Sequence, residues 1–184
     1  RGTPLVAVAT AVLLDRPLPG ADESKLGRVL VVRRPPGGLL AGMWGFPAVE
    51  GSHADSMAAR RALGELLATS GLACRLMELP FGRWEHVFSH RRWRLEAFLG
   101  WPLGDADPHD WPRRLAERLG IPGEDALWVH EERWAELALP RPFQRVLEGL
   151  RRRVMADYGR LDFSLDLRQT SLPGFQQDPS PGME

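Results

Sequence analysis

A helix predicted after Asp55 carries one glutamate at a position where a group of carboxylates could bind magnesium for hydrolysis. Cleaving a nucleoside diphosphate linkage needs magnesium held by oxygen ligands. Carboxylates at positions i, i+3 and i+4 of a helix share one face and would form such a site, but these positions hold Glu65, Ala68 and Thr69. One carboxylate is a poor magnesium ligand set. The alternative role of Glu65 is an ion pair with Arg61 one turn earlier, which adds about 0.2–0.5 kcal/mol.

The positions of two histidines and the presence of a single cysteine argue against a zinc site and an iron–sulfur cluster in this chain. Cys74 is the only cysteine, so this chain forms no internal disulfide, all-cysteine zinc site or four-cysteine iron–sulfur cluster. His86 and His90 lie in a segment that Val87 and Phe88 favour as a strand. Four residues along a strand span roughly 13 Å, which is too far for one zinc ion. We therefore expect no metal site in this chain.

A short polar segment separates two predicted strands, at residues 82–89 and 93–101. Phe88, Ser89 and His90 offer an aromatic ring, a hydroxyl and an imidazole. The alternative is a purely structural role, in which Phe88 belongs to the core and the two polar residues form a turn. Arg91, Arg92 and Arg94 follow closely enough to meet a DNA backbone, although a solvated charged edge would show the same pattern.

Composition limits the partners that this chain can have. The 24 Lys and Arg residues balance 24 Asp and Glu residues, which argues against strong non-specific DNA binding. No run approaches the roughly 20 apolar residues of a membrane span, and the apolar start lacks the long basic region of a signal peptide. We expect a cytoplasmic protein without a membrane partner. Because the chain begins at Arg1, we also expect that a longer polypeptide contains it.

The remaining pattern alternates strands and helices. Residues 5–14 and 28–34 read as buried strands, residues 55–70 as a helix that Asp55 caps and Gly71 ends, and residues 111–119 as a second helix. Short strands are expected at residues 76–79 and 127–130, and further helices at residues 131–137 and 143–158. The loop at residues 33–47 combines four glycines with Leu39, Leu40, Met43, Trp44 and Phe46. It carries too much apolar area for an exposed loop, so we expect it to fold against a core.

This order of strands, glycine-rich loop and helix resembles the Nudix fold, an α/β/α sandwich around a mixed sheet. The resemblance covers about residues 5–150. When the enzymatic signature of the Nudix family is registered on Gly71, its characteristic positions fall on the following residues: Glu50, Ser56, Gly64, Glu65, Leu66, Ala68 and Thr69. Most of the signature's charged residues are therefore replaced, which favours a binding module over a hydrolase.

Two motifs indicate which module. The segment from Arg34 to Pro47 resembles the GLLAGLWEFP segment of the C-terminal domain of MutY-type adenine DNA glycosylases, with Met43 and Gly45 as departures. The residues from His86 to His90 resemble the H-x-F-S-H segment of the same domain. That domain recognises 8-oxoguanine opposite the adenine that an N-terminal domain removes. The resemblance implies double-stranded DNA with an 8-oxoguanine:adenine mispair as partner, and an iron–sulfur cluster in the N-terminal domain upstream.

The same resemblance implies roles for the polar segment. Relative to guanine, 8-oxoguanine gains a hydrogen-bond donor at N7 and an oxygen at C8, so Ser89 could accept from one atom and donate its backbone N–H to the other. Phe88 would offer a stacking surface, and His90 would orient the loop or meet a phosphate. Arg91 and Arg92 would contact the DNA backbone. None of these residues is catalytic.

The chain ends in a polar segment that we expect to be a disordered tail, so the predicted domains are residues 1–158 and 159–184. Within the tail, Gln169, Leu172 and Phe175 resemble the short peptide by which many bacterial repair proteins hold the β sliding clamp. The alternative is an unbound tail with stray apolar residues. Two alternatives for the whole chain also stay open. One is a hydrolase of oxidised nucleoside triphosphates that uses Glu50 and Glu65, and the other is a docking module without lesion preference.

Overall fold

A five-stranded mixed sheet forms the larger part of the fold. The structure is a computed structural model that describes residues 3–17, 26–51 and 53–164, with side chains described as far as Val154. Strands β4 (Ala48–Gly51), β1 (Leu5–Leu13), β7 (Arg92–Pro102) and β5 (Cys74–Leu76) lie in this order, and β6 (Gly82–Val87) also pairs with β7. β1 and β7 run parallel, whereas the other pairs are antiparallel. The predicted mixed sheet is confirmed.

A smaller antiparallel sheet packs beside it and places the glycine-rich loop. It consists of β3 (Trp44–Gly45), β2 (Arg28–Arg33) and β8 (Ala126–His130), in that order. The loop at residues 34–43 therefore joins two paired strands, β2 and β3. Phe46 is buried, and Leu39, Leu40 and Trp44 pack against the core, as the apolar content of the loop predicts.

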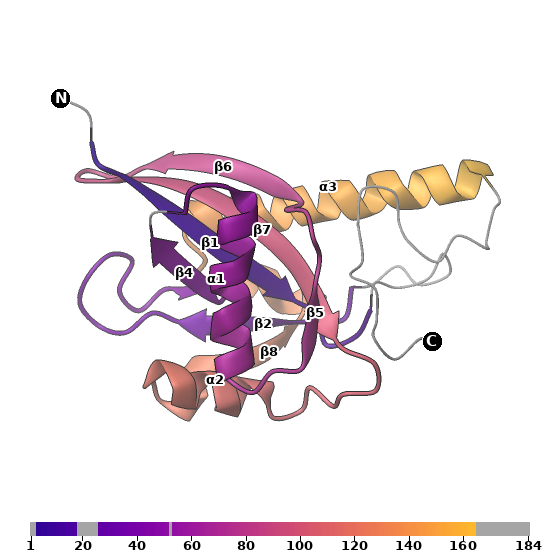
Figure 1. The fold of residues 1–184 in the computed structure, drawn as a ribbon, viewed down its shortest axis with the longest axis horizontal. Helices are drawn as coiled ribbons and strands as arrows, with labels where there is room; N and C mark the ends of the chain where they lie inside the picture. The colour runs from indigo at the N-terminus through magenta and orange to yellow at the C-terminus, as the bar shows by residue number, and fades with distance from the viewer. Residues whose placement is uncertain (1–2, 18–25, 52, 165–184) are drawn as a thin grey trace.

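Helices cover both faces of the larger sheet (Figure 1). Alternate residues of β1 point to opposite faces: Ala9 and Leu13 join the cluster that contains Leu63 of α1 (Ser56–Thr69), while Val8 joins the one that contains Phe143 of α3 (Arg141–Ser164). The α/β/α sandwich is thus confirmed. Among the described residues, no helix is long and apolar enough to cross a membrane.

The ends of α1 follow the capping signals of the sequence. The Asp55 carboxylate accepts a hydrogen bond from the Ala58 N–H at 2.8 Å, which satisfies one of the free donors of the first turn. At the other end, Gly71 has a φ of +78° directly after the last cap residue, Ser70. α2 (Trp111–Leu119) has the predicted bounds. These two helices are the elements that local sequence specifies best.

Several boundaries differ from the predictions. β4 was not predicted, because a short AVEG segment has no alternation and forms a strand only by pairing with β1. β5 ends at Leu76, where the predicted strand begins. The predicted helix at residues 131–137 is the 3₁₀ helix η2 (Glu131–Glu136), and a second 3₁₀ turn, η1 (Gly123–Asp125), precedes β8. α3 continues past the predicted boundary at residue 158 to Ser164.

The packing around Gly45 explains why this position holds glycine, which is one of the two departures from the GLLAGLWEFP motif. A Cβ added at Gly45 would lie 2.8 Å from the Phe143 ring, so Gly45→Ala should reduce the free energy of unfolding by about 1–3 kcal/mol through overpacking. Gly64→Ala is the matched control. A Cβ there meets nothing within 4 Å, and alanine should stabilise the helix by up to about 1 kcal/mol. Urea unfolding of both variants tests the pair, and equal stability of Gly45→Ala and wild type would contradict this packing.

Candidate functional site

The helix α1 carries most of the residues on which the family signature was registered. Where a metal-binding carboxylate would stand, the Thr69 hydroxyl accepts a hydrogen bond from Arg118 Nε at 3.1 Å. Glu50 lies 3.7 Å from the Arg34 guanidinium, and Glu65 is exposed and not ion-paired with Arg61 in the described part of the chain. No cluster of three or more potential metal ligands occurs among the described residues. Of the registered positions at 65, 68 and 69, only Glu65 therefore keeps a carboxylate, and Thr69 is hydrogen-bonded to Arg118.

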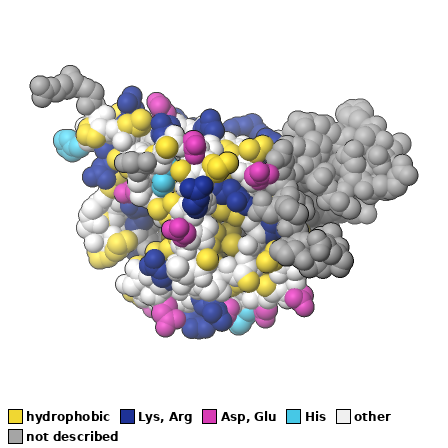
Figure 2. Space-filling view, viewed as in Figure 1, with side chains coloured by type: hydrophobic (Ala, Val, Ile, Leu, Met, Phe, Trp, Pro, Cys, Tyr) yellow, Lys and Arg dark blue, Asp and Glu magenta, His cyan; other side chains and the backbone are white. Residues whose placement is uncertain are grey.

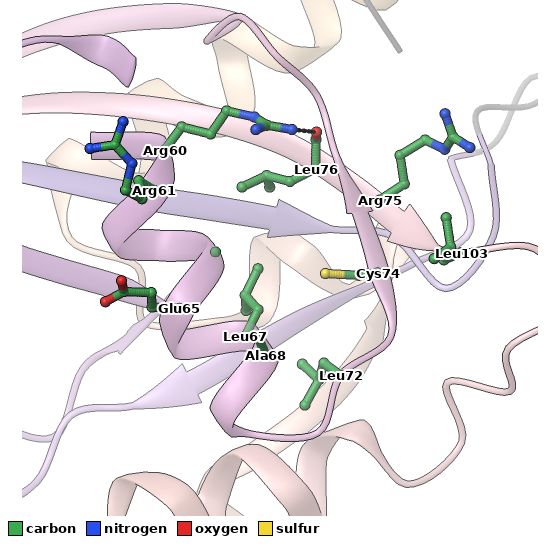
Figure 3. Close-up of a pocket in the computed structure, with 11 residues that line it drawn as sticks. Arg60, Arg61, Glu65, Leu67, Ala68, Leu72, Cys74, Arg75, Leu76 and Leu103 are labelled. Atoms are coloured by element: carbon green, nitrogen blue, oxygen red, sulfur yellow. Dashed lines mark hydrogen bonds between the residues drawn. The ribbon is translucent and has the colours of Figure 1, made fainter. Parts of the chain in front are cut away.

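Two hollows lie beside α1. The hollow between α1 and β5 has a volume of about 550 Å³ and is walled by Leu67, Leu72 and Leu103 (Figure 3). Burial raises the pKa of the Cys74 thiol to about 11, so this thiol is a poor nucleophile at neutral pH. Arg60 lies along the rim of the hollow and donates to the Leu76 carbonyl at 2.6 Å. The arrangement ties the end of β5 to the helix.

The second hollow, about 730 Å³, lies at the start of α1. Its buried carboxylate, Glu96, accepts a hydrogen bond from the Ser56 hydroxyl and forms an ion pair with Arg83 at 3.1 Å. Ser56 occupies a glutamate position of the registered signature, and its hydroxyl is used within the protein. Glu96 is thus a paired structural group. Figure 2 shows basic and acidic side chains interspersed on this face.

The polar segment forms the turn between β6 and β7, as predicted. The Phe88 N–H donates to the Arg91 carbonyl at 2.7 Å and closes the turn. The structure divides the three proposed recognition residues into two kinds. Phe88 is half-buried and packs against the core, whereas Ser89 and His90 are exposed at the tip. The hairpin therefore exposes Ser89 and His90 at its tip and packs Phe88 against the core at its base.

Aromatic contacts fix the base of this hairpin. The Phe88 ring lies 5.1 Å from the Trp93 ring and 4.6 Å from the His86 ring, both edge to face. Partial burial, together with the positive charges of Arg145 and Arg141 on α3, lowers the pKa of His86. Neutral His86 is therefore favoured at the base of the hairpin. His90 lies in the turn and not in the strand, so the predicted strand spacing does not separate the two imidazoles.

The arginines after the turn form no ion pair with an acidic residue among the described residues. Arg91 is exposed, and Arg92 Nε is buried with no hydrogen-bond partner in the described part of the chain. Arg94 donates to the His53 carbonyl at 3.3 Å. Elsewhere, arginines such as Arg28 and Arg133 pair with nearby carboxylates. Arg83 on β6 pairs with Glu96 on β7, whereas Arg91 and Arg92 near the tip have no such ion pair among the described residues. Cations that are not neutralised in this way can bind an anionic partner.

Arg34 and Trp93 connect the hairpin to the glycine-rich loop, and sequence reasoning gave neither a role. The Arg34 guanidinium stacks over the Trp93 ring at 5.6 Å, and its Nε donates to the Leu39 carbonyl at 3.0 Å. Trp93 is fully buried and also contacts Phe143. The hairpin tip and the loop lie toward the same end of the molecule, at the left in Figure 1. Only the pairing of distant strands brings these residues together, so no local signal reveals them.

Comparisons with known proteins agree with this architecture. The NUDIX domain family model matches residues 23–149. The C-terminal domain of mouse MUTYH, solved in complex with human PCNA, is 23% identical with a TM-score of 0.54, over 79% of this chain and 87% of that chain. A NUDIX hydrolase from Nitrosomonas europaea is 14% identical with a TM-score of 0.52, over 79% and 87%. NrtR from Shewanella oneidensis, complexed with a 27mer DNA, is 14% identical with a TM-score of 0.54, over 82% of this chain and 63% of that chain.

Proposed function

This chain belongs to the Nudix family, and within that family we propose that it is a DNA-recognition domain that does not hydrolyse nucleotides. The proposed partner is duplex DNA with 8-oxoguanine opposite adenine, and the proposed parent protein is a MutY-type adenine glycosylase. One observation carries the proposal. The hairpin exposes Ser89 beside Arg91, which has no acidic partner in the described residues, while the signature helix carries Thr69 bonded to Arg118 where a magnesium ligand would stand.

The chemistry of Ser89 fits the oxidised base. Within the described residues, no hydrogen bond engages either its hydroxyl or its N–H. The hydroxyl can therefore accept from the N7–H of 8-oxoguanine while the N–H donates to the oxygen at C8. Guanine has an acceptor at N7 and lacks that oxygen, so it leaves the Ser89 N–H without a partner. An unpaired group of this kind costs about 1–3 kcal/mol when the contact excludes water.

A hydrolase of oxidised nucleoside triphosphates is the second candidate, because one structural neighbour is a NUDIX hydrolase. It would have to place magnesium on Glu50 and Glu65. Glu50 is already close to Arg34, at 3.7 Å, and Glu65 has no carboxylate one turn away. The geometry therefore favours recognition over hydrolysis.

The remaining partners follow from the proposed parent protein. The iron–sulfur cluster would belong to the N-terminal glycosylase domain, and this chain would carry no cofactor. Gln169, Leu172 and Phe175 lie outside the described residues, so the clamp-binding peptide stays a prediction. The mouse MUTYH domain was solved in complex with human PCNA, which supports testing this chain for a protein partner. The proposed location of the protein is the bacterial cytoplasm, where such repair occurs.

Two assays on the same preparation separate the candidates. Fluorescence anisotropy should show tighter binding to a duplex with 8-oxoguanine opposite adenine than to the matched guanine duplex. Incubation with 8-oxo-dGTP and magnesium should release no pyrophosphate above the blank. Equal affinity for the two duplexes would contradict lesion recognition, and magnesium-dependent turnover that Glu65→Gln abolishes would establish the hydrolase instead.

A further inference from the structure

We propose that the loop between β2 and β3 is a second DNA contact, in which the N–H groups of Gly37 and Gly38 at its tip and the Arg33 guanidinium at its base meet phosphates of the duplex that the hairpin reads. This inference rests on the proposed function, since it adds a backbone contact to the same DNA. The loop is not part of the proposed base-recognition site. Three features of the loop support an anionic ligand: its ordered base, its tip of exposed glycines, and an arginine without an acidic partner among the described residues.

The loop is rigid at its base. The Arg34 N–H donates to the Met43 carbonyl at 2.9 Å, and the Gly42 N–H donates back to the Arg34 carbonyl at 3.0 Å. Leu40 has a φ of +60°, a backbone conformation that residues other than glycine rarely adopt, and its side chain packs against the core. A partner would therefore meet a loop that is already ordered, and binding would cost little conformational entropy.

The tip of the loop presents backbone without bulky side chains. Pro35, Pro36, Gly37 and Gly38 are all exposed, and the two glycines have φ values of +86° and +82°. A Cβ added at either glycine would meet nothing within 4 Å, so internal packing does not require glycine there. The N–H groups of Gly37 and Gly38 have no hydrogen-bond partner within the described residues. Free N–H groups on a bare turn can approach a phosphate closely.

Arg33 adds the positive charge. It is exposed, its Nε donates to the Gly42 carbonyl at 3.0 Å, and no carboxylate pairs with it in the described part of the chain. The neighbouring acidic group, Glu50, is directed to Arg34. Arg33 therefore resembles Arg91 and Arg92 of the hairpin, which also form no ion pair with a carboxylate in the part of the chain that the structure describes. Cations on both the loop and the hairpin suit the repeated phosphates of one duplex.

The contacts from Arg34 through Trp93 to Phe88 join the loop to the hairpin, and both elements face the same end of the molecule (Figure 1). A duplex seated on Ser89 would thus extend past the loop. The hairpin would supply the base-specific contact. The loop would fix the position of the DNA without reading its sequence, as phosphate contacts do.

Arg33→Gln tests the charge, with Arg113→Gln on α2 as the control. Anisotropy titrations of the full chain with both duplexes across NaCl concentrations should show a salt slope reduced by about 1 for Arg33→Gln. Raising salt from 50 to 200 mM would then reduce the affinity of this variant by roughly 4-fold less than it reduces the affinity of wild type. The ratio of affinities for the 8-oxoguanine and guanine duplexes should not change. A wild-type slope for Arg33→Gln would remove this residue from the DNA contact.

The paired variant Gly37→Asn with Gly38→Asn tests the bare tip. Asparagine tolerates positive φ but adds bulk, so DNA affinity should fall while the melting temperature stays at the wild-type value. Gly104→Asn is the control, because Gly104 also has a positive φ, +58°, and open space around its Cβ position. Wild-type affinity of the paired variant would overturn the inference. If wild type shows no lesion preference but both loop variants bind weakly, the proposed function fails and the DNA contact stands.

Discussion

Replacing Ser89 by Ala is expected to lower the preference for 8-oxoguanine over guanine by about 5-fold to 150-fold, which corresponds to about 1–3 kcal/mol. The variant leaves the N7–H of the oxidised base facing a methyl group, whereas binding of ordinary guanine changes little. Because Ser89 is exposed at the tip of the hairpin, the free energy of unfolding should stay within about 0.5 kcal/mol of wild type. Paired titrations with the two duplexes measure the ratio directly.

Ser89→Thr is the matched control for this experiment. It keeps the hydroxyl and the backbone N–H, so most of the preference should remain, and any loss through the added methyl group should affect both duplexes. His90→Ala adds a second comparison, because loss of a phosphate contact would weaken both duplexes equally. An unchanged ratio for Ser89→Ala would remove Ser89 from the recognition site.

Trp93→Ala is expected to have the largest effect on stability, a loss of about 3–5 kcal/mol. Trp93 is fully buried, and its ring contacts Phe88 at 5.1 Å, Phe143 at 6.1 Å and the Arg34 guanidinium at 5.6 Å. For a chain of this size each kcal/mol shifts the melting temperature by about 2–4 °C, so thermal unfolding should show a fall of about 6–20 °C.

Trp93→Phe separates the ring contacts from the indole nitrogen. The buried Nε1 of Trp93 has no hydrogen-bond partner in the described residues, so phenylalanine loses no hydrogen bond and should cost much less than alanine. A melting temperature of Trp93→Ala within 2 °C of wild type would contradict the packing described for the hairpin base. In urea unfolding, equal costs of the two variants would show that the ring contacts contribute little.

Much of the fold is visible in local sequence. The strands at β1 and β2 are short apolar runs that end at polar residues or prolines, and α1 has both a capping aspartate and a terminating glycine. β4 was missed because its four residues become a strand only through pairing with β1. The 3₁₀ form of η2 was missed because residues 131–137 contain helix-forming residue types and no signal for the tighter turn.

Some features of the candidate site could also be predicted from local sequence, whereas others depend on contacts between distant residues. The positions of Ser89 and His90 at a hairpin tip follow from the two flanking strand patterns, and the structure confirms the hairpin. The stacking of Arg34 over Trp93 depends on β1 pairing in parallel with β7 and on the small sheet packing beside it, neither of which leaves a local trace. The Arg118 contact to Thr69 is equally non-local. Sequence could show that carboxylates are missing from α1, but not which groups meet the residues that replace them.

The central claim is that the hairpin tip distinguishes 8-oxoguanine from guanine. Titration of the ¹⁵N-labelled chain with each duplex, followed by amide chemical shifts, tests it most directly. We predict that the largest shift differences between the two duplexes occur at the Ser89 and His90 amides, while signals near Glu50 and Glu65 respond alike. Identical shifts at the tip with both duplexes, or the largest differences at Glu50 and Glu65, would contradict the claim.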